Sequence, residues 1–249
     1  MDETIKKQLQ FLQLKWLQEN WDAVLGEAKK KRCSYQRLLT DIIKREYDDR
    51  KEKARFARIK RANIPELLVV ETFPFSKQPK LDKKKVMGIY DSLEFITQKQ
   101  QLIFIGPTGC GKSGLGTAFL IHAINQGCRG YFIDFGDLMR RFLQSRADHS
   151  EHKLLKRFCS YDTLLIDELG YDPLEKEQAG LFFELVKARN RKRTTILTTQ
   201  LGFEEWESFL HNEHLAAALI DRITVNCSVF DMQKCISIRP KNVVYATKK

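Results

Sequence analysis

A run with the spacing G-x-x-x-x-G-K-[ST], from Gly106 to Ser113, carries the clearest chemistry in the sequence. Its glycines let the backbone curl, so that successive N–H groups point at phosphate oxygens. Lys112 would place its charge on the β- and γ-phosphates, and the Ser113 hydroxyl would ligate Mg²⁺. The run therefore predicts a loop that binds ATP together with Mg²⁺. The residues expected at the nucleotide are Gly106, Pro107, Thr108, Gly109, Cys110, Gly111, Lys112, Ser113 and Gly114.

Two adjacent carboxylates follow a short apolar run, Leu164–Ile166. Asp167 would hold the metal together with Ser113, and Glu168 would orient or deprotonate the attacking water. Asp167 lies 55 residues after Lys112, which leaves room for one helix, one strand and one further helical unit. A small-molecule kinase must exclude water, whereas this pair recruits it. The residues therefore favour an ATPase over a phosphotransferase.

Two further positions could complete the chemistry. The run Thr194–Gln200 would form a strand beside that of Asp167, and Thr199 or Gln200 at its end could sense the γ-phosphate. An ordinary turn after a strand would give the same pattern. Arg222 ends a stretch rich in Ala and Leu. It is either a surface arginine or one that reaches the γ-phosphate of a neighbouring subunit, and the spacing alone leaves both open.

The elements that must position these residues follow an alternating pattern. Strands alternating with helices are typical of βαβ units and a mainly parallel sheet with helices on both faces, and ligands bind such sheets at the carboxyl ends of the strands. The expected strands are 102–105, 131–135, 163–167, 194–199 and 223–230. The expected helices among them are 114–125, 174–190 and 204–219, with helical pieces up to 158. Helices are also expected over 4–25, 34–62 and 83–97, the first with Ile5, Leu12 and Trp16 on its apolar face.

Composition narrows the class of protein. The chain has 249 residues, of which 43% are hydrophobic, enough for a core domain and a smaller appendage. Its apolar runs are far shorter than the roughly 20 residues of a membrane helix, and the N-terminus does not resemble a signal peptide. The six cysteines form no C-x-x-C pair, so a zinc site is not expected. Free thiols suit a reducing compartment, and we expect a cytoplasmic protein without membrane contact.

Positive charge is concentrated in one segment of the sequence. The net charge is +11, and residues 29–63 hold 14 Lys/Arg against 5 Asp/Glu. Such a segment is typical of a nucleic-acid binder, although a solvated helix face gives the same count. The run 189–193 is a weaker candidate, because a helix C-terminus favours cations in any case. A second group lies on the helical pieces between 138 and 158, and its candidate DNA contacts are Arg140, Arg141, Lys153, Lys156 and Arg157.

The sequence from 102 to 238 resembles the AAA+ ATPases of the IstB/DnaC-like group. The matching motifs are Gly106–Ser113, Leu164–Leu174, Phe203–Trp206 and Leu215–Arg222. The second of these, with Asp-Glu-Leu-Gly-Tyr-x-Pro-Leu, is much more specific than the nucleotide loop, which many families share. Residues 34–75 also resemble the small helical domain of the family, so the likeness covers nearly the whole chain.

The resemblance implies an α/β P-loop NTPase (AAA+) fold, a parallel sheet flanked by helices, with no C-terminal lid. It implies a basic helical domain over 1–75 that binds DNA or a partner, followed by the ATPase domain over 76–249. Asp167 and Glu168 take the Walker B roles, and Arg222 matches the arginine finger of the family. Gln200 stands where the family usually has asparagine, which puts its sensor role in doubt.

The same resemblance implies a helper of transposition. ATP would assemble the protein as a homo-oligomer or filament on duplex DNA, where it would select a target and stimulate a transposase. Hydrolysis, stimulated by DNA or by the partner, would dissolve the complex. The alternative is a helicase loader that binds a replicative helicase and single-stranded DNA. The motifs do not separate these two hypotheses.

Overall fold

The computed structural model describes residues 1–171, 174 and 176–239. Two compact units divide the chain, Met1–Ala57 and Arg58–Lys249. The family resemblance placed the domain boundary between 75 and 76. Residues 58–75 nevertheless belong to the second unit, where Ala62 and Val70 are buried in the same apolar cluster as the strands of the sheet. Residues 172 and 173 of the family motif lie outside the described part.

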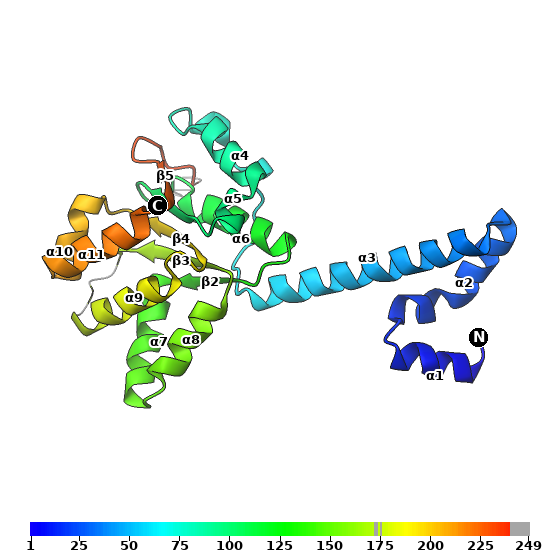
Figure 1. The fold of residues 1–249 in the computed structure, drawn as a ribbon. Coiled ribbons are helices and arrows are strands. Elements are labelled where there is room, and N and C mark those ends of the chain that lie inside the picture. The colour runs from blue at the N-terminus through cyan, green and yellow to red at the C-terminus, as the bar shows by residue number, and fades with distance from the viewer. Residues whose placement is uncertain (172–173, 175, 240–249) are drawn as a thin grey trace, which may run out of the picture. The chain divides into compact units, whose positions relative to one another are not determined.

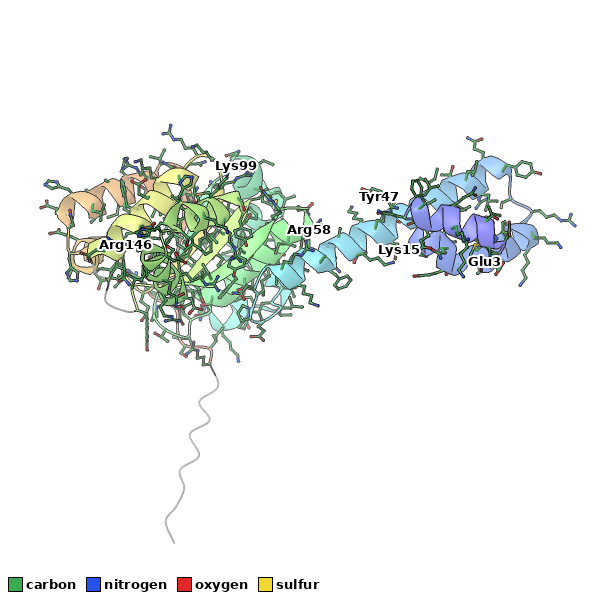
Figure 2. All side chains as sticks on the ribbon, turned by 90° about the horizontal axis from the view of Figure 1, so that it is seen from below. Glu3, Lys15, Tyr47, Arg58, Lys99 and Arg146 are labelled. Atoms are coloured by element: carbon green, nitrogen blue, oxygen red, sulfur yellow. The ribbon has the colours of Figure 1, made fainter. Side chains whose placement is uncertain are left out.

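The first unit consists of α1 (Glu3–Phe11), α2 (Lys15–Lys31) and most of α3 (Tyr35–Arg61). Figure 2 labels Glu3, Lys15 and Tyr47, one residue on each of these helices. The single helix expected over 4–25 is wrong, because the chain turns between α1 and α2. Gln13 has a φ of +56° in this turn.

Side chains of α3 hold the turn between α1 and α2. Arg50 donates hydrogen bonds to the carbonyls of Leu12 and Gln13. The buried Glu46 accepts a hydrogen bond from the Leu17 N–H at 3.0 Å, which caps the first turn of α2. Leu12, expected on the apolar face, is exposed, while Leu9 is buried instead. The break therefore depends on contacts between helices that a helical period does not encode.

The second unit is built on a five-stranded sheet with the order β2-β3-β4-β1-β5, in which all neighbouring strands are parallel. The strands are β1 (Gln101–Ile105), β2 (Gly130–Asp134), β3 (Thr163–Leu169), β4 (Thr194–Thr199) and β5 (Cys227–Asp231). The predicted parallel sheet is confirmed. Because β4 lies between β1 and β3, the residues that follow these three strands meet at one edge of the sheet.

Helices cover both faces of the sheet, as Figure 1 shows. Consecutive residues of β1 point to opposite faces: Leu102 and Phe104 pack with one cluster, and Ile103 and Ile105 with the other. The first cluster includes α4 (Lys83–Ser92), α5 (Glu94–Thr97) and α6 (Lys112–Asn125). The second includes α7 (Phe135–Ala147), α8 (Glu151–Ser160), α9 (Lys176–Arg189), α10 (Trp206–Leu210) and α11 (Glu213–Thr224). Strands buried on both faces explain the continuous apolar runs in the sequence.

Short elements complete the second unit. They are the 3₁₀ turns η1 (Val70–Thr72), η2 (Phe75–Lys77) and η3 (Phe203–Glu205). The helix expected over 83–97 is interrupted at Leu93, which has a φ of +57°. Within the described residues, no helix follows β5, and none combines the length and apolarity that a membrane crossing requires.

The His122 ring of α6 is half-buried and stacks on Tyr90 of α4. Their ring centroids are 4.0 Å apart at an interplanar angle of 18°. Burial lowers the pKa of His122, and no hydrogen-bond partner for its buried Nε2 occurs among the described residues. The neutral imidazole is therefore the form that the fold accommodates.

We expect the free energy of unfolding to fall as the pH drops below 6.5, the ordinary pKa of histidine. The unfolded chain binds the proton more readily than the folded chain. The free energy of unfolding is therefore highest above pH 6.5, and it falls as the pH drops from 6.5 to the lower pKa of His122 in the folded state. Urea denaturation at several pH values measures this dependence. Phenylalanine in place of His122 keeps the stacking and should flatten the dependence. An equal slope in both proteins would contradict the assignment.

Candidate active site

The loop between β1 and α6 has the backbone that the glycine spacing requires. Gly109 and Gly111 have φ values of +81° and +101°, in the left-handed region that favours glycine. At Gly106 a Cβ atom would lie 2.7 Å from the backbone of Met232, so only glycine permits this close approach. Lys112 begins α6, and the N–H groups at that end of the helix have no partner within the helix. The loop therefore forms an anion cradle at a helix N-terminus.

Lys112 places its ammonium group inside the loop. Its Nζ donates to the carbonyls of Gly106 at 2.7 Å and Pro107 at 2.9 Å. Burial lowers the pKa of Lys112, while the charges of Asp167 and Glu168 oppose the shift. A buried cation held at the glycine-rich loop is suited to a polyphosphate.

Asp167 and Ser113 meet at the carboxyl edge of the sheet. The buried Asp167 carboxylate accepts a hydrogen bond from the hydroxyl of Thr198. Burial raises the pKa of Asp167, and the hydroxyls of Thr198 and Ser113 oppose the shift. Among the described residues, no group of three or more His, Cys, Asp or Glu side chains is placed to hold a metal ion. One hydroxyl and one carboxylate fit Mg²⁺, which takes few protein ligands when phosphates and water supply the others.

Glu168 leaves the strand in a strained conformation. Its φ is +59°, and the register between β3 and β4 shifts between Ile166 and Leu169. This irregularity leaves the Glu168 side chain exposed, on the wall of the pocket that Lys112 and Ser113 also line. Burial and the charge of Asp167 raise the pKa of Glu168. A left-handed glutamate costs on the order of 1–3 kcal/mol, and such strain is concentrated at functional sites.

Thr198 holds both carboxylate residues, and the sequence did not single it out. Its fully buried Oγ1 accepts a hydrogen bond from the Glu168 N–H at 3.0 Å and donates one to Asp167. A single hydroxyl thus fixes the side chain of Asp167 and the irregular backbone at Glu168. The available signal was a hydroxyl in an otherwise buried strand, since such a group requires partners.

Valine in place of Thr198 should lower the free energy of unfolding by about 1–3 kcal/mol, because the Glu168 N–H loses its acceptor. ATP hydrolysis should also fall, and serine at this position should restore it. Urea denaturation and phosphate release measure the two effects. The matched control is Thr163→Val in β3. Thr163 is also buried, and no partner for its hydroxyl occurs in the described part of the chain, so its loss should not destabilise. Equal losses in both variants would contradict this role for Thr198.

Thr199 and Gln200 both line the pocket, but their polar groups differ in use. The Thr199 hydroxyl accepts a hydrogen bond from the Leu201 N–H at 3.0 Å, which shapes the turn after β4. The Gln200 Oε1 accepts one from the Thr108 hydroxyl at 2.9 Å. Of the two candidates for a sensor, Gln200 is therefore the one attached to the nucleotide loop.

The pocket also includes residues that the sequence did not indicate. Glu66 and Leu68 come from the segment before η1, and Ile238 and Arg239 come from the segment after β5. The exposed Tyr171, from the family motif after β3, also lines the pocket. The residues before η1 and after β5 are distant in sequence from the glycine-rich loop, and no local motif links them to it.

Arg222 lies on α11 and is not among the described residues that line this pocket. Its guanidinium is 4.8 Å from the centre of the Phe183 ring, and its Nη1 donates to the Ala218 carbonyl at 2.7 Å. The structure therefore does not bring Arg222 together with the nucleotide loop of the same chain. A role in hydrolysis would require a second subunit.

The candidate DNA contacts on α7 and α8 differ in their partners. Arg140 pairs with Asp137, and Arg141 donates to the Tyr131 hydroxyl at 3.3 Å. The side chain of Arg157 lies over the ring of the same tyrosine, at 6.0 Å from its centre.

Other cations of this region are free to contact a ligand. Lys153 and Lys156 are exposed, and within the described residues neither has an ion-pair partner. Arg146 of α7, labelled in Figure 2, is exposed as well.

Arg189 is not available for the contact with DNA or a subunit that was expected of the run 189–193. It is only 1% exposed. Its guanidinium donates to the carbonyls of Phe158, Tyr161 and Thr194. Burial lowers the pKa of Arg189 to about 10. Its role is to join α8, α9 and β4, and it is not available to a partner.

Comparison with known proteins identifies the family. The sequence profile of the IstB-like ATP binding proteins matches residues 7–246. The chain belongs to this family. This chain is 31% identical over 221 residues to the ATP-binding protein of insertion sequence IS232 of Bacillus thuringiensis subsp. berliner. The alignment covers 89% of this chain and 88% of that relative. The chain is 30% identical over 212 residues to the ATP-binding protein of IS21 of Pseudomonas aeruginosa, with 85% of this chain and 80% of the relative covered.

Solved structures show the same fold at low identity. The DnaC helicase loader has a TM-score of 0.52 and 22% identity, over 70% of this IstB-like chain and 97% of its own. AMPPCP-bound DnaA from Aquifex aeolicus has a TM-score of 0.56 and 15% identity, over 69% and 51% of the two chains. The predicted P-loop NTPase fold and the predicted family are both confirmed. The protein is thus an ATP-binding P-loop NTPase related to the ATP-binding proteins of insertion sequences.

Proposed function

We propose that this protein is an ATPase that helps transposition. ATP assembles it as an oligomer or filament on duplex DNA, where it presents a target to a transposase and stimulates that enzyme. Hydrolysis of ATP then dissolves the assembly. The observation that supports this function best is the match to insertion-sequence ATP-binding proteins across nearly the whole chain.

Each residue of the site has a proposed role in hydrolysis. The loop amides and Lys112 bind the phosphates, and Ser113 and Asp167 hold Mg²⁺, which neutralises charge on the phosphates when it is bound. Glu168 accepts a proton from the attacking water or orients it. Thr198 keeps the two carboxylates in place, and Gln200 senses the γ-phosphate.

Binding to DNA is proposed through the phosphate backbone. The chain carries a net charge of +11, and Lys153 and Lys156 are exposed cations without an ion-pair partner in the described residues. Contacts of this kind release counterions, so binding should weaken steeply as salt is added.

Alanine at both Lys153 and Lys156 should weaken DNA binding and reduce the slope of log affinity against log salt by about 0.9 for each phosphate that the protein no longer neutralises. Fluorescence anisotropy with a labelled duplex at several salt concentrations measures the slope. The matched control replaces Lys6 and Lys187, which are ion-paired within their own helices. If both double variants change the slope equally, α8 does not form the contact surface.

Sedimentation with DNA tests the function as a whole. The purified protein is centrifuged with duplex or single-stranded DNA, with and without ATP and Mg²⁺. We expect heavy assemblies on duplex DNA that require ATP, and their loss in Lys112→Ala. Assemblies that persist in this variant would contradict the proposal. Small complexes that prefer single strands, together with a stable complex with a replicative helicase, would instead support the helicase-loader hypothesis.

A further inference from the structure

The segment after β5 contacts the nucleotide loop directly. The Met232 N–H donates to the Ile105 carbonyl at 2.7 Å, and the Ile238 N–H donates to the Gly109 carbonyl at 2.9 Å. A Cβ atom at Gly109 would lie 2.5 Å from the Ser237 Oγ, so the two segments are in close contact. The conformation of the loop therefore depends on a segment more than a hundred residues away in the sequence.

Gln78 joins this segment to the loop. Its side chain follows η2 and is only 1% exposed. Its Nε2 donates to the Cys110 carbonyl at 3.1 Å and to the Ile236 carbonyl at 2.6 Å. Its Oε1 accepts from the Ile236 N–H at 3.0 Å. The carboxamide nitrogen thus donates two hydrogen bonds and its oxygen accepts one, so neither atom is left without a partner.

These bonds bear on nucleotide binding through the geometry of the peptide group. In a trans peptide the C=O and the following N–H point in opposite directions. The bond from Gln78 that fixes the direction of the Cys110 carbonyl therefore also fixes the Gly111 N–H, which points the opposite way. The bond from Ile238 to the Gly109 carbonyl does the same for the Cys110 N–H. These are amides of the loop whose N–H groups are expected to face the phosphates.

We propose that Gln78 is a positioning residue for nucleotide binding, which pre-orients the amides of the loop by holding the Cys110 carbonyl and the segment 236–238. It acts through the backbone and does not itself touch ATP. Pre-organised donors cost no reordering when the ligand arrives, so their loss weakens affinity. The inference rests on ATP binding at this loop and is independent of DNA or a transposase.

Gln101 provides a matched control within the same unit. It begins β1, at the opposite end of the strand from the nucleotide loop, and is 5% exposed. Its Nε2 donates to the carbonyls of Lys99 and Arg193, each at 3.1 Å. Its Oε1 accepts from the Thr195 N–H at 2.9 Å. The two glutamines therefore make the same set of bonds, but only Gln78 makes one to the loop.

The experiment compares Gln78→Met with Gln101→Met by titration calorimetry with a non-hydrolysable ATP analogue and Mg²⁺. Methionine keeps the length of the side chain and removes its hydrogen bonds. Both variants should melt at a lower temperature than the wild type. Only Gln78→Met should raise the Kd for the analogue, by roughly tenfold, the change that corresponds to about 1.4 kcal/mol. In steady-state hydrolysis its KM should rise more than its kcat falls.

The outcomes separate this inference from nucleotide binding itself. If the wild type binds the analogue and Gln78→Met binds it equally well, Gln78 has only a structural role and the inference is wrong. Equal weakening in both variants would overturn it too, because general destabilisation would then explain the effect. If the wild type itself does not bind the analogue, the proposal of a nucleotide site at this loop is wrong, and the inference about Gln78 is wrong with it. Should Gln78→Met not fold, Gln78→Asn, one methylene shorter, is measured in the same way with the same criteria.

Discussion

Glutamine in place of Glu168 should lower ATP hydrolysis by about 10²–10⁴-fold while ATP binding persists. The amide has the shape of the carboxylate but cannot accept a proton from water. The phosphate contacts belong to the loop and to Lys112, which this change leaves intact. Phosphate release measures hydrolysis, and calorimetry with a non-hydrolysable ATP analogue measures binding.

Stability provides the control for this variant. Burial and neighbouring carboxylates raise the pKa of Glu168 above its ordinary value of 4.5. A carboxyl group whose pKa is raised in the folded state favours folding at acidic pH and opposes it at neutral pH, where both states are ionised. Removing this charge should therefore leave the free energy of unfolding at neutral pH unchanged or slightly higher. A variant that melts early and no longer binds ATP would contradict a purely catalytic role.

Glu168 and the glycine-rich loop stand out in the sequence because their signals are local. Consecutive residues supply the proposed phosphate loop, Gly106–Ser113, and the proposed pair of carboxylates, Asp167 and Glu168. The parallel sheet was predictable too, since apolar runs alternate with helical periods. What no local pattern reports is the conformation of Glu168, whose φ of +59° depends on the register shift against β4.

The residues that the sequence missed act over long separations. Thr198 is 30 residues from Glu168, and Gln78 is 158 residues from Ile236. Arg189 belongs to a basic run that the sequence offers as a DNA or subunit contact, yet its donors are used by carbonyls of α8 and β4. A polar side chain in an apolar neighbourhood signals that partners exist but does not identify them. Only the packed structure names them.

Helix breaks were missed for a related reason. Helical periodicity continues through Gln13 and Leu93, but both residues adopt a positive φ. At the first break, Arg50 and Glu46 of α3 supply the hydrogen bonds that the interrupted helix lacks. Tertiary contacts thus outweigh the local preference, which is worth only tenths of a kcal/mol per residue, up to about 0.7, for ordinary residues.

Alanine in place of Arg222 should lower hydrolysis by about 10³–10⁵-fold without weakening ATP binding, if the residue acts as an arginine finger in a neighbouring subunit. The guanidinium rests on Phe183 of its own chain and is not at its own nucleotide pocket. An effect on hydrolysis would therefore have to pass between subunits. Lys187→Ala is the control, because it removes a positive charge from α9, which packs against α11, and should leave the rate unchanged.

Mixing two inactive variants decides whether Arg222 acts between subunits. Lys112→Ala cannot bind ATP productively but keeps its arginine, whereas Arg222→Ala binds ATP but has no arginine to offer. In a mixed assembly on duplex DNA, the first variant would supply Arg222 to the nucleotide held by the second, and part of the hydrolysis should return. The recovered rate should rise with protein concentration, because it requires association. If the mixture stays inactive while each variant still assembles with the wild type, then Arg222 acts within its own chain or only stabilises the packing of α11 on α9.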